Sequence, residues 1–342
     1  MDVQEELLSA EAFGVPSHIP IERIQTHISW VFLLEKDVYK VKRPVELGFL
    51  DFSSVEKRRV ACEAEVELNR RLAPHAYLGV VPICRASTGR LQVGGPGQVI
   101  DWAVHMQRLC DEDRADTLLE RGQLSPRLID AIASRLAAFH AQAACDRDIS
   151  SWGSPEHVAQ NIRENFAQTR NTIDRLLPAA EADELERWQV DFVLKSAALL
   201  RQRVQQKRVR DGHGDLRLEH VYLEADNVTV LDCIEFNDRF RYADVCADIA
   251  FLSMDLGAHG RVDLAELLLA RYARYANDYD LYGVVDFYES YRALVRAKIA
   301  CFTAQDEMVD HPTRERAWSQ ARRYALVSLA AKRSVLVPPV LV

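Results

Sequence analysis

The stretch "HGDLRLEHVYL", residues 213–223, decides the fold class of this chain. It places Asp215 in a tight loop with Gly212 and Gly214, directly before a strand-like segment. A second carboxylate, Asp232, ends the next strand-like segment, "VTVLD". Because a hairpin between these two segments brings their outer ends to one edge of the sheet, we expect the two carboxylates to lie close together.

A lysine pair upstream completes a chemical pattern. In "DVYKVKRP" Lys40 and Lys42 are two residues apart on a predicted strand, so they share one face. The helix predicted after it offers Glu63, Glu65 and Glu67 as ion-pair partners. Phosphoryl transfer from a nucleotide needs a carboxylate at the attacking hydroxyl, oxygen ligands for magnesium and a lysine on the phosphates. The sequence contains each of these parts.

Periodicity predicts two lobes of different composition. Residues 21–43 favour three short antiparallel strands, and residues 78–86 and 97–109 favour two more. Within residues 51–74 a long helix is expected, with Ser53 or Ser54 as its cap and Pro74 just past its end. Helical patterns dominate afterwards, including one helix over 188–210 and helices from Val245 onward. We expect an α+β fold with a small antiparallel β-rich N-lobe (1–106) carrying one long helix, and a larger, mainly helical C-lobe (107–342).

Composition excludes several classes of protein. The 342 residues are 48% hydrophobic and carry a net charge of −8, which disfavours binding to nucleic acid or to an anionic membrane. Seven scattered cysteines without a CxxC pair suggest neither a disulfide framework nor a zinc site. The first residues lack a signal-peptide pattern, and no apolar run reaches the length of a membrane span. We expect a soluble cytoplasmic protein.

The chain resembles the aminoglycoside-phosphotransferase-like kinases, a small-molecule branch of the protein-kinase-like fold. The resemblance covers "THISWVFL", "VYKVKRP", "GFLDFSSVEKRR", "HGDL", "IEFND", "DIAFLSMDL" and "YRALVRAK". It is greatest with uncharacterised bacterial members that are often joined to a P-loop ATPase domain. Because this sequence contains no G-x-x-x-x-G-K-[ST] motif, we expect any such ATPase to be a separate partner. The resemblance implies a two-lobed fold and ATP-dependent transfer of the γ-phosphate to a hydroxyl of a small molecule, such as a sugar or an aminoglycoside-like compound.

The resemblance also assigns roles at and near the catalytic loop. Asp215 would orient or deprotonate the acceptor hydroxyl, and Asp232 would bind magnesium. Lys40 would bind the α- and β-phosphates with Glu65 as its partner, and Lys42 is the alternative lysine.

Further roles lie outside that loop. The turn from Thr26 to Ser29 would cover the phosphates in place of a glycine-rich loop. Adenine would lie against the segment from Met106 to Leu109, and Asp248 would brace the catalytic loop.

One letter of the opening stretch departs from the kinase pattern. The residue five positions after the catalytic aspartate is an asparagine that helps to hold magnesium in kinases, and here it is His220. Imidazole suits transition metals better than magnesium, so His220 could favour Mn²⁺, leave a single Mg²⁺, or contact the phosphates itself. Three functions remain open: an active phosphotransferase, a catalytically weak pseudokinase that regulates a partner, and an AMP transferase.

Two groups of basic residues stand outside this pattern. Arg292 and Arg296 are four residues apart on a predicted helix, where they either form surface ion pairs or bind an anionic group of the acceptor. The basic run that includes Arg201, Arg203 and Lys207 is most simply the solvated end of a helix. His140, in "LAAFH", is expected to pack within its helix.

Overall fold

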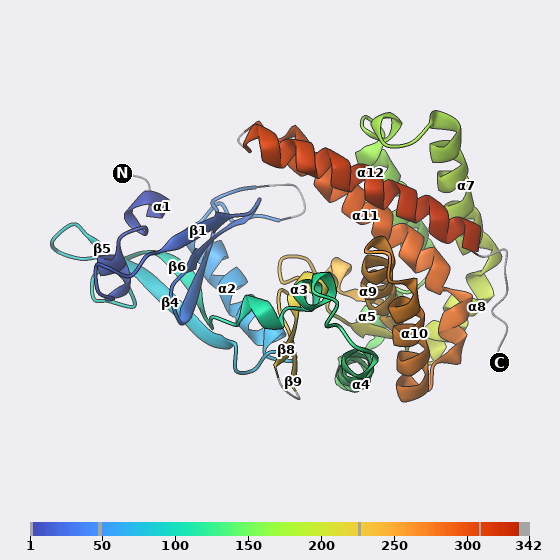
Figure 1. Ribbon diagram of the computed structural model, residues 1–342, viewed down its shortest axis with the longest axis horizontal. Coiled ribbons are helices and arrows are strands. Elements are labelled where there is room, and N and C mark those ends of the chain that lie inside the picture. Colours follow the sequence, from blue (N-terminus) through green and yellow to red (C-terminus); the bar gives the residue numbers. More distant parts are fainter. Residues whose placement is uncertain (1–2, 47–49, 225–226, 308, 335–342) are drawn as a thin grey trace. The chain divides into compact units, whose positions relative to one another are not determined.

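The computed structural model describes residues 3–46, 50–224, 227–307 and 309–334, which form two compact units (Figure 1). The sheet unit comprises Met1–Glu120 and Glu219–Asp238, and the helical unit comprises Arg121–Leu218 and Arg239–Val342. The α+β fold class is confirmed, with an antiparallel sheet in one unit and mostly helices in the other. This grouping follows packing rather than chain order, and the lobe boundary expected at residues 106 and 107 stays a prediction.

A six-stranded antiparallel sheet dominates the first unit, in the order β1-β2-β3-β6-β4-β5. Its strands are β1 (Glu22–Gln25), β2 (Ser29–Leu33), β3 (Asp37–Lys42), β4 (Tyr77–Arg85), β5 (Leu91–Val93) and β6 (Gln98–Gln107). The three strands expected within residues 21–43 are confirmed. The short strand β5 was not expected, because three residues carry too little alternation to be recognised.

The long helix α2 (Val55–Asn69) packs against β4 and β6 of this sheet. Ser54 caps it, since its hydroxyl accepts a hydrogen bond from the backbone N–H of Lys57. Cys62 and Val66 on its inner side join a buried cluster with Tyr77 from the sheet. The helix therefore holds Glu65, on the same inner side, against the sheet.

Shorter elements complete the sheet unit. The hairpin of β8 (Val221–Glu224) and β9 (Asn227–Val230) belongs to it, because Tyr222 and Leu231 pack against the cluster beneath α2. The central residues of the expected hairpin turn, 225 and 226, lie outside the described residues. The remaining elements are α1 (Val3–Glu6), η1 (Ala10–Phe13), η2 (Asp111–Asp113), α3 (Ala115–Glu120) and η4 (Leu218–His220), which crosses the boundary of the units.

The second unit is a set of helices around α9 (Val245–Ala258), which is buried along nearly its whole length. Its other helices are α4 (Pro126–Gln142), α5 (Arg147–Ser151), α6 (Pro155–Thr169), α7 (Ala179–Lys195), α8 (Ala197–Gln205), α10 (Val262–Ala276), α11 (Val285–Gln305) and α12 (His311–Ser334), with the short turns η3 (Ile173–Arg175), η5 (Asp238–Phe240) and η6 (Tyr279–Gly283). Helix α11 packs against α9 and α12. The strands β7 (Val209–Asp211) and β10 (Tyr242–Asp244) form a two-stranded sheet that leads into the loop around Asp215.

Two expectations for the segment 188–210 are wrong. The single helix is two helices that break at Ser196, whose backbone N–H bonds to the carbonyl of Phe192. The basic run is not wholly solvated, because the side chain of Arg203 is fully buried between Asp244 and Asp278. A buried arginine looks like a surface arginine in sequence when its partners lie far along the chain.

Among the described residues, no helix is both long enough and apolar enough to cross a membrane.

Candidate active site

Five charged residues of the sheet unit form a group that we call the lysine cluster: Lys40, Lys42, Glu65, Asp232 and Glu235. The ammonium of Lys40 lies 2.9 Å from Glu65 Oε1 and 2.5 Å from Asp232 Oδ1. The ammonium of Lys42 contacts the other oxygen of Glu65 and the carboxylate of Glu235. Glu65 from α2 therefore bridges two lysines of β3, and Lys40 carries the link onward to Asp232.

Lys40 and Asp232 of the lysine cluster each stabilise the charged form of the other. Desolvation lowers the pKa of Lys40, but the carboxylates of Asp232 and Glu65 outweigh it and hold this pKa well above its usual range. Desolvation raises the pKa of Asp232, yet the charges of Lys40 and, less strongly, His220 keep it well below its usual range. Lys40 and Asp232 are therefore both ionised at neutral pH.

Asp232 occupies an unusual backbone conformation. Its φ of +65° lies in the left-handed region, which non-glycine residues rarely adopt. Its backbone N–H donates to the hydroxyl of Tyr77, and the next N–H, of Cys233, donates to Asn69 Oδ1 at 2.8 Å. These two hydrogen bonds hold the backbone in its strained conformation. Strained residues of this kind are found mainly at functional sites. Half of the Asp232 side chain stays exposed.

The side chains of the two lysines differ in exposure, which bears on the predicted choice between them as the phosphate ligand. The side chain of Lys42 is fully buried and its ammonium is held by two buried carboxylates. The side chain of Lys40 keeps 13% exposure and contacts Asp232, the exposed member of the cluster. A ligand reaches Lys40 more readily, so the geometry favours Lys40 over Lys42.

The loop around Asp215, residues 213–217, belongs to the helical unit, and we call it the aspartate loop. Asp248 of α9 accepts hydrogen bonds from the backbone N–H of His213 at 2.7 Å and of Gly214 at 2.9 Å. Gly212 is required here, because a Cβ on it would lie 2.4 Å from Asp248 Oδ2. The expected brace is confirmed: Asp248 fixes the backbone immediately before Asp215.

Asp248 is itself held in its charged form. Desolvation raises its pKa, but His140, which lies 3.3 Å away and bonds also to Tyr272, outweighs this and keeps the pKa well below its usual range. His140 is thus the packed helix residue that the sequence predicted. Its contact with Asp248 also has a structural role, because it orients the carboxylate that holds the backbone of the aspartate loop.

The carboxylate of Asp215 is paired within its own loop. Arg217 Nε lies 3.2 Å from both oxygens, and its Nη2 lies 3.1 Å from Oδ2. A guanidinium in this position favours the ionised carboxylate, which is the form that accepts a proton.

His220 lies beside Asp232 within the sheet unit. Its Nε2 is 3.7 Å from Asp232 Oδ2, and its carbonyl accepts the backbone N–H of Leu231. No group of three or more His, Cys, Asp or Glu side chains within the described ranges has the geometry of a metal site. One exposed carboxylate nevertheless suits Mg²⁺, which takes few protein ligands and fills its shell with phosphate oxygens and water. Asp232 therefore fits as the protein ligand, and the second ligand that the kinase pattern places at position 220 is a nitrogen.

The predicted nucleotide-binding positions differ in availability. Ser29 is fully buried, and the turn before it is closed by Thr26 Oγ1, which accepts the Ser29 N–H at 2.9 Å. Met106 is buried within β6. The backbone N–H of Gln107 and that of the next residue already donate to carbonyls, whereas the N–H of Leu109 donates to no residue that the structure describes. Leu109 is therefore the position of this segment best able to bond to a base.

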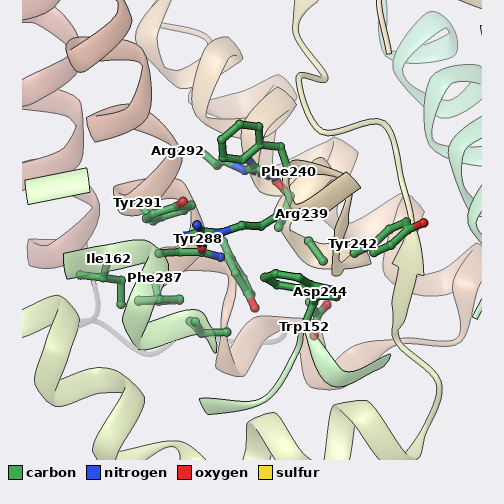
Figure 2. A pocket seen from close by; sticks show the side chains of 14 residues that line it. Trp152, Ile162, Arg239, Phe240, Tyr242, Asp244, Phe287, Tyr288, Tyr291 and Arg292 are labelled. Atoms are coloured by element: carbon green, nitrogen blue, oxygen red, sulfur yellow. Dashed lines mark hydrogen bonds between the residues drawn. The ribbon is translucent and has the colours of Figure 1, made fainter. Parts of the chain in front are cut away.

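The structure separates the two arginines of α11. Arg292 is buried, and its Nε donates to the carbonyl of Ala247 in α9. Arg296 lies over the ring of Tyr324 in α12. The alternative of a surface ion pair is wrong for Arg292, which lies within the helical unit and lines a pocket there (Figure 2).

Sequence reasoning missed two residues of these groups. Glu235 in "CIEF" neutralises Lys42, and Arg217 in "HGDLR" holds Asp215. Arg217 had a local signal, because a charged residue two positions after a loop aspartate can reach back to it. Glu235 had none, since its partner is nearly two hundred residues away.

Comparison with known proteins agrees with this geometry. Residues 38–290 match the model of the phosphotransferase enzyme family, APH. The uncharacterized protein Rv2004c of Mycobacterium tuberculosis (strain ATCC 25618 / H37Rv) is 36% identical over 293 residues, which is 86% of this chain and 57% of that protein. The chain therefore spans little more than half the length of the curated relatives that it matches.

Solved structures show the same fold at low sequence identity. A thermostable mutant of aminoglycoside phosphotransferase APH(4)-Ia aligns with a TM-score of 0.54 at 13% identity, over 98% of this chain and all of that chain. The choline kinase of Cryptosporidium parvum Iowa II aligns with a TM-score of 0.53 at 10% identity, over 98% of both chains. The two-lobed, protein-kinase-like fold that the motifs implied is confirmed, and the chain belongs to the phosphotransferase enzyme family.

Proposed function

We propose that this protein is an ATP-dependent phosphotransferase that transfers the γ-phosphate of ATP to a hydroxyl of a small molecule. The observation that carries the proposal is Lys40, held between Glu65 and the half-exposed Asp232. A lysine paired with a helix glutamate is the arrangement that places a cation on the phosphates in kinases. The family supports a phosphotransferase, and the lysine cluster supports a nucleotide as the donor.

The reaction assigns a task to each residue. Lys40 binds the α- and β-phosphates and offsets the charge that builds up on the leaving ADP. A hydroxyl oxygen of the acceptor attacks the γ-phosphorus, so that an O–P bond forms while the bond to the β-γ bridging oxygen breaks. Asp215 accepts the hydroxyl proton, and Arg217, whose Nε lies 3.2 Å from it, orients its carboxylate.

Magnesium would be held by Asp232, with His220 beside it. When bound, the ion neutralises phosphate charge and orients the γ-phosphate. The chain's own contribution is the fixed backbone of Asp232, which aims the carboxylate through Tyr77 and Asn69. His220 would contact the phosphates or accept a softer metal such as Mn²⁺.

A nucleotide-binding regulator is the second candidate. The observation that favours it is the imidazole of His220, 3.7 Å from Asp232, at the position where kinases use an amide oxygen. Such a protein binds ATP through the lysine cluster and turns it over slowly. A separate P-loop ATPase is the partner that we propose for it, as for the enzyme.

Product identity separates the candidates. The purified protein is incubated with ATP, Mg²⁺ or Mn²⁺ and a panel of small alcohols, sugars and hydroxy acids, and the products are followed by ³¹P NMR. The proposal predicts ADP and a phosphate ester. AMP attached to an acceptor, with release of pyrophosphate, would identify an AMP transferase, and ATP-dependent thermal stabilisation without any product would identify a regulator.

Lys40→Met provides the control for donor binding. It removes the ammonium while keeping the side-chain length, so stabilisation by ATP should fall together with turnover. Lys57→Met, at an exposed ion pair with Asp51 outside the lysine cluster, is the matched variant that should change neither. If Lys40→Met binds and turns over ATP like the wild type, the assigned donor site is wrong.

A further inference from the structure

The helical unit contains a cavity of about 40 Å³ that has no assigned role (Figure 2). It lies between α6, α11 and the segment that leads from η5 into α9. Figure 2 shows side chains of α11, among them Tyr288 and Tyr291, across the cavity from Tyr242 and Trp152. Arg239 and Arg292 also line it, so the lining combines aromatic rings with two cations.

Arg292 is a buried arginine that forms no ion pair with any residue that the structure describes. The residue is only 6% exposed, and its one hydrogen bond to the described residues joins Nε to the carbonyl of Ala247 at 3.2 Å. The guanidinium lies 5.0 Å from the ring centre of Phe251. Across the described part of the chain no carboxylate lies within ion-pair distance of it, whereas buried cations are ordinarily paired.

The other charged residues around the cavity are neutralised. Arg239 pairs with Glu164 at 2.5 Å, and Asp244 pairs with Arg203 at 2.6 Å. Asp248 lies near enough for Arg292 to lower its pKa, but it is the lesser of several influences there, and Asp248 already accepts the two backbone N–H groups of the aspartate loop. The positive charge of Arg292 is therefore the one that a ligand would meet.

Hydrogen-bond donors without a described partner line the same cavity as Arg292. The hydroxyls of Tyr288 and Tyr291 and the indole N–H of Trp152 bond to no residue within the described ranges, and all three side chains line the cavity. Burial raises the pKa of both tyrosines, so their hydroxyls remain protonated. Arginine and tryptophan donate only, and a protonated tyrosine can donate, which makes the lining suited to an acceptor of hydrogen bonds.

The volume limits what this lining can hold. A water molecule needs roughly 10–15 Å³ of such space, so about 40 Å³ admits about three water-sized groups. That is the size of a carboxylate and is too small for a sugar ring or a nucleobase. A planar carboxylate also matches the fork of a guanidinium.

The first turn of α9 connects the cavity to the aspartate loop. Ala247, which lines the cavity and accepts the bond from Arg292, directly precedes Asp248 in α9. Asp248 holds the two residues before Asp215. Arg292 is thus linked to the aspartate loop through two adjacent residues of α9, Ala247 and Asp248.

We propose that this cavity binds the carboxylate of the phosphate acceptor, so that the acceptor is a small hydroxy acid. This inference rests on the proposed function, because it names the class of molecule that Asp215 would activate. A carboxylate provides the missing countercharge for Arg292 and accepts hydrogen bonds from Tyr288 and Tyr291. Its hydroxyl end then extends toward the aspartate loop.

Direct binding tests the cavity without reference to catalysis. Sodium acetate is titrated into the full chain without nucleotide, at constant ionic strength, and thermal unfolding is followed against ethanol as the uncharged analogue. Acetate should raise the Tm saturably and ethanol should not. Arg292→Met should weaken acetate binding by about tenfold or more, the worth of a charge-assisted hydrogen bond.

Arg296→Met is the matched control, because Arg296 lies one turn away on the same helix and does not line the cavity. Equal acetate binding by wild type, Arg292→Met and Arg296→Met, or no binding by the wild type, would overturn the proposal. If Arg292→Met does not fold, Tyr291→Phe tests the same cavity, since it removes one donor and leaves the ring. It should weaken acetate binding and spare the Tm without acetate.

Kinetics then separate an acceptor from an effector. If the carboxylate belongs to the acceptor, acetate inhibits phosphoryl transfer competitively against a hydroxy acid, and Arg292→Lys raises the acceptor KM more than it lowers kcat. Acetate binding with no competition against the acceptor would mean that the anion is a separate effector, and the proposal would be wrong. Because the binding assay contains no ATP, its result stands even if the phosphotransferase activity is absent.

Discussion

Two buried charge clusters of this chain differ in how much of their charged side chains is exposed. In the helical unit, Arg203 is fully buried and donates four hydrogen bonds to the carboxylates of Asp244 and Asp278. In the sheet unit, Lys40 joins Glu65 to Asp232, which keeps a half-exposed side chain on a left-handed backbone. The side chains of the first cluster are almost fully buried and paired with one another, whereas the second cluster keeps a half-exposed carboxylate.

The difference teaches how to tell a structural network from a functional one. A closed network offsets the cost of its own desolvation and contributes to the fold alone. An open network holds a charged group in a strained, accessible position, where it can act on something that is not part of the protein. Variants in the closed network should therefore change stability, and variants in the open one should change activity.

The largest expected effect is on the closed network. Arg203→Met leaves two buried carboxylates without their cation and should lower the free energy of unfolding by about 3–5 kcal/mol. Arg201→Met, on the exposed side of the same helix, should change it by less than about 0.5 kcal/mol. Urea denaturation of both variants measures this, and equal stability of the two would remove the distinction between the clusters.

The two lysines divide the open cluster into an accessible half and a closed half. Lys40→Met should lower phosphoryl transfer by about 10²–10³-fold with a smaller loss of stability, because it removes a cation from the phosphates. Lys42→Met should lower the free energy of unfolding by about 3 kcal/mol, since Glu235 then remains buried without its partner. Parallel kinetics and urea denaturation check both, and the reverse pattern would assign the phosphates to Lys42.

Glu289 differs from the carboxylates of both clusters, because it forms no ion pair with any residue that the structure describes. Burial raises the pKa of Glu289 in α11 to about 8, with Asp286 and Glu266 nearby and a hydrogen bond from Ser253. Because this folded-state pKa lies above the ordinary 4.5, the folded protein holds a proton that the unfolded chain releases. Its contribution to stability is present below about pH 4.5 and is lost as the pH rises through about 8.

Glu289→Gln should remove that dependence. The loss of stability between about pH 5 and about pH 8 should shrink by about 3 kcal/mol relative to the wild type. Urea denaturation at both pH values is the measurement. Asp263→Asn, at an exposed ion pair in α10, should leave the wild-type dependence nearly unchanged. A wild-type pH dependence in Glu289→Gln would show that Glu289 is ionised in the fold.

The smallest effect concerns the departure from the kinase pattern. His220→Asn restores an amide oxygen beside Asp232 and should lower the Mg²⁺ concentration for half-maximal activity by about fivefold. In the same variant, Mn²⁺ should no longer support a higher activity than Mg²⁺. Metal titrations of the steady-state rate test this, and an unchanged Mg²⁺ requirement would show that His220 takes no part in metal binding.

Local patterns predicted what depends on neighbouring residues. The strands within residues 21–43, the cap at Ser54 and the brace by Asp248 all followed from periodicity or from a resemblance over short motifs. Distant partners that no motif of the resemblance indicated escaped prediction, because the sequence does not show which charged residues are buried. Arg203 was expected in solvent for this reason, and the role of Glu235 was not seen.

The residues of the candidate site also differ in whether the sequence could predict them. Residue types and spacing named Asp215, Asp232 and Lys40, since the chemistry of phosphoryl transfer requires them. The cavity beside Arg292 could not be predicted, because its lining comes from four separate segments and its volume depends on how their side chains pack. Acceptor specificity therefore has to be inferred from three-dimensional structure.

The most direct test of the account is the transfer of label from [γ-³²P]ATP to a panel of small alcohols, sugars and hydroxy acids by the wild type and by Asp215→Asn. The substitution keeps the shape of the side chain and removes its ability to accept the proton. We predict labelled acceptor with the wild type and a rate lower by about 10²–10⁴-fold with Asp215→Asn. Equal transfer by the two proteins, or no transfer by a wild type that binds ATP, would contradict the assignment of this chain as a phosphotransferase acting through Asp215.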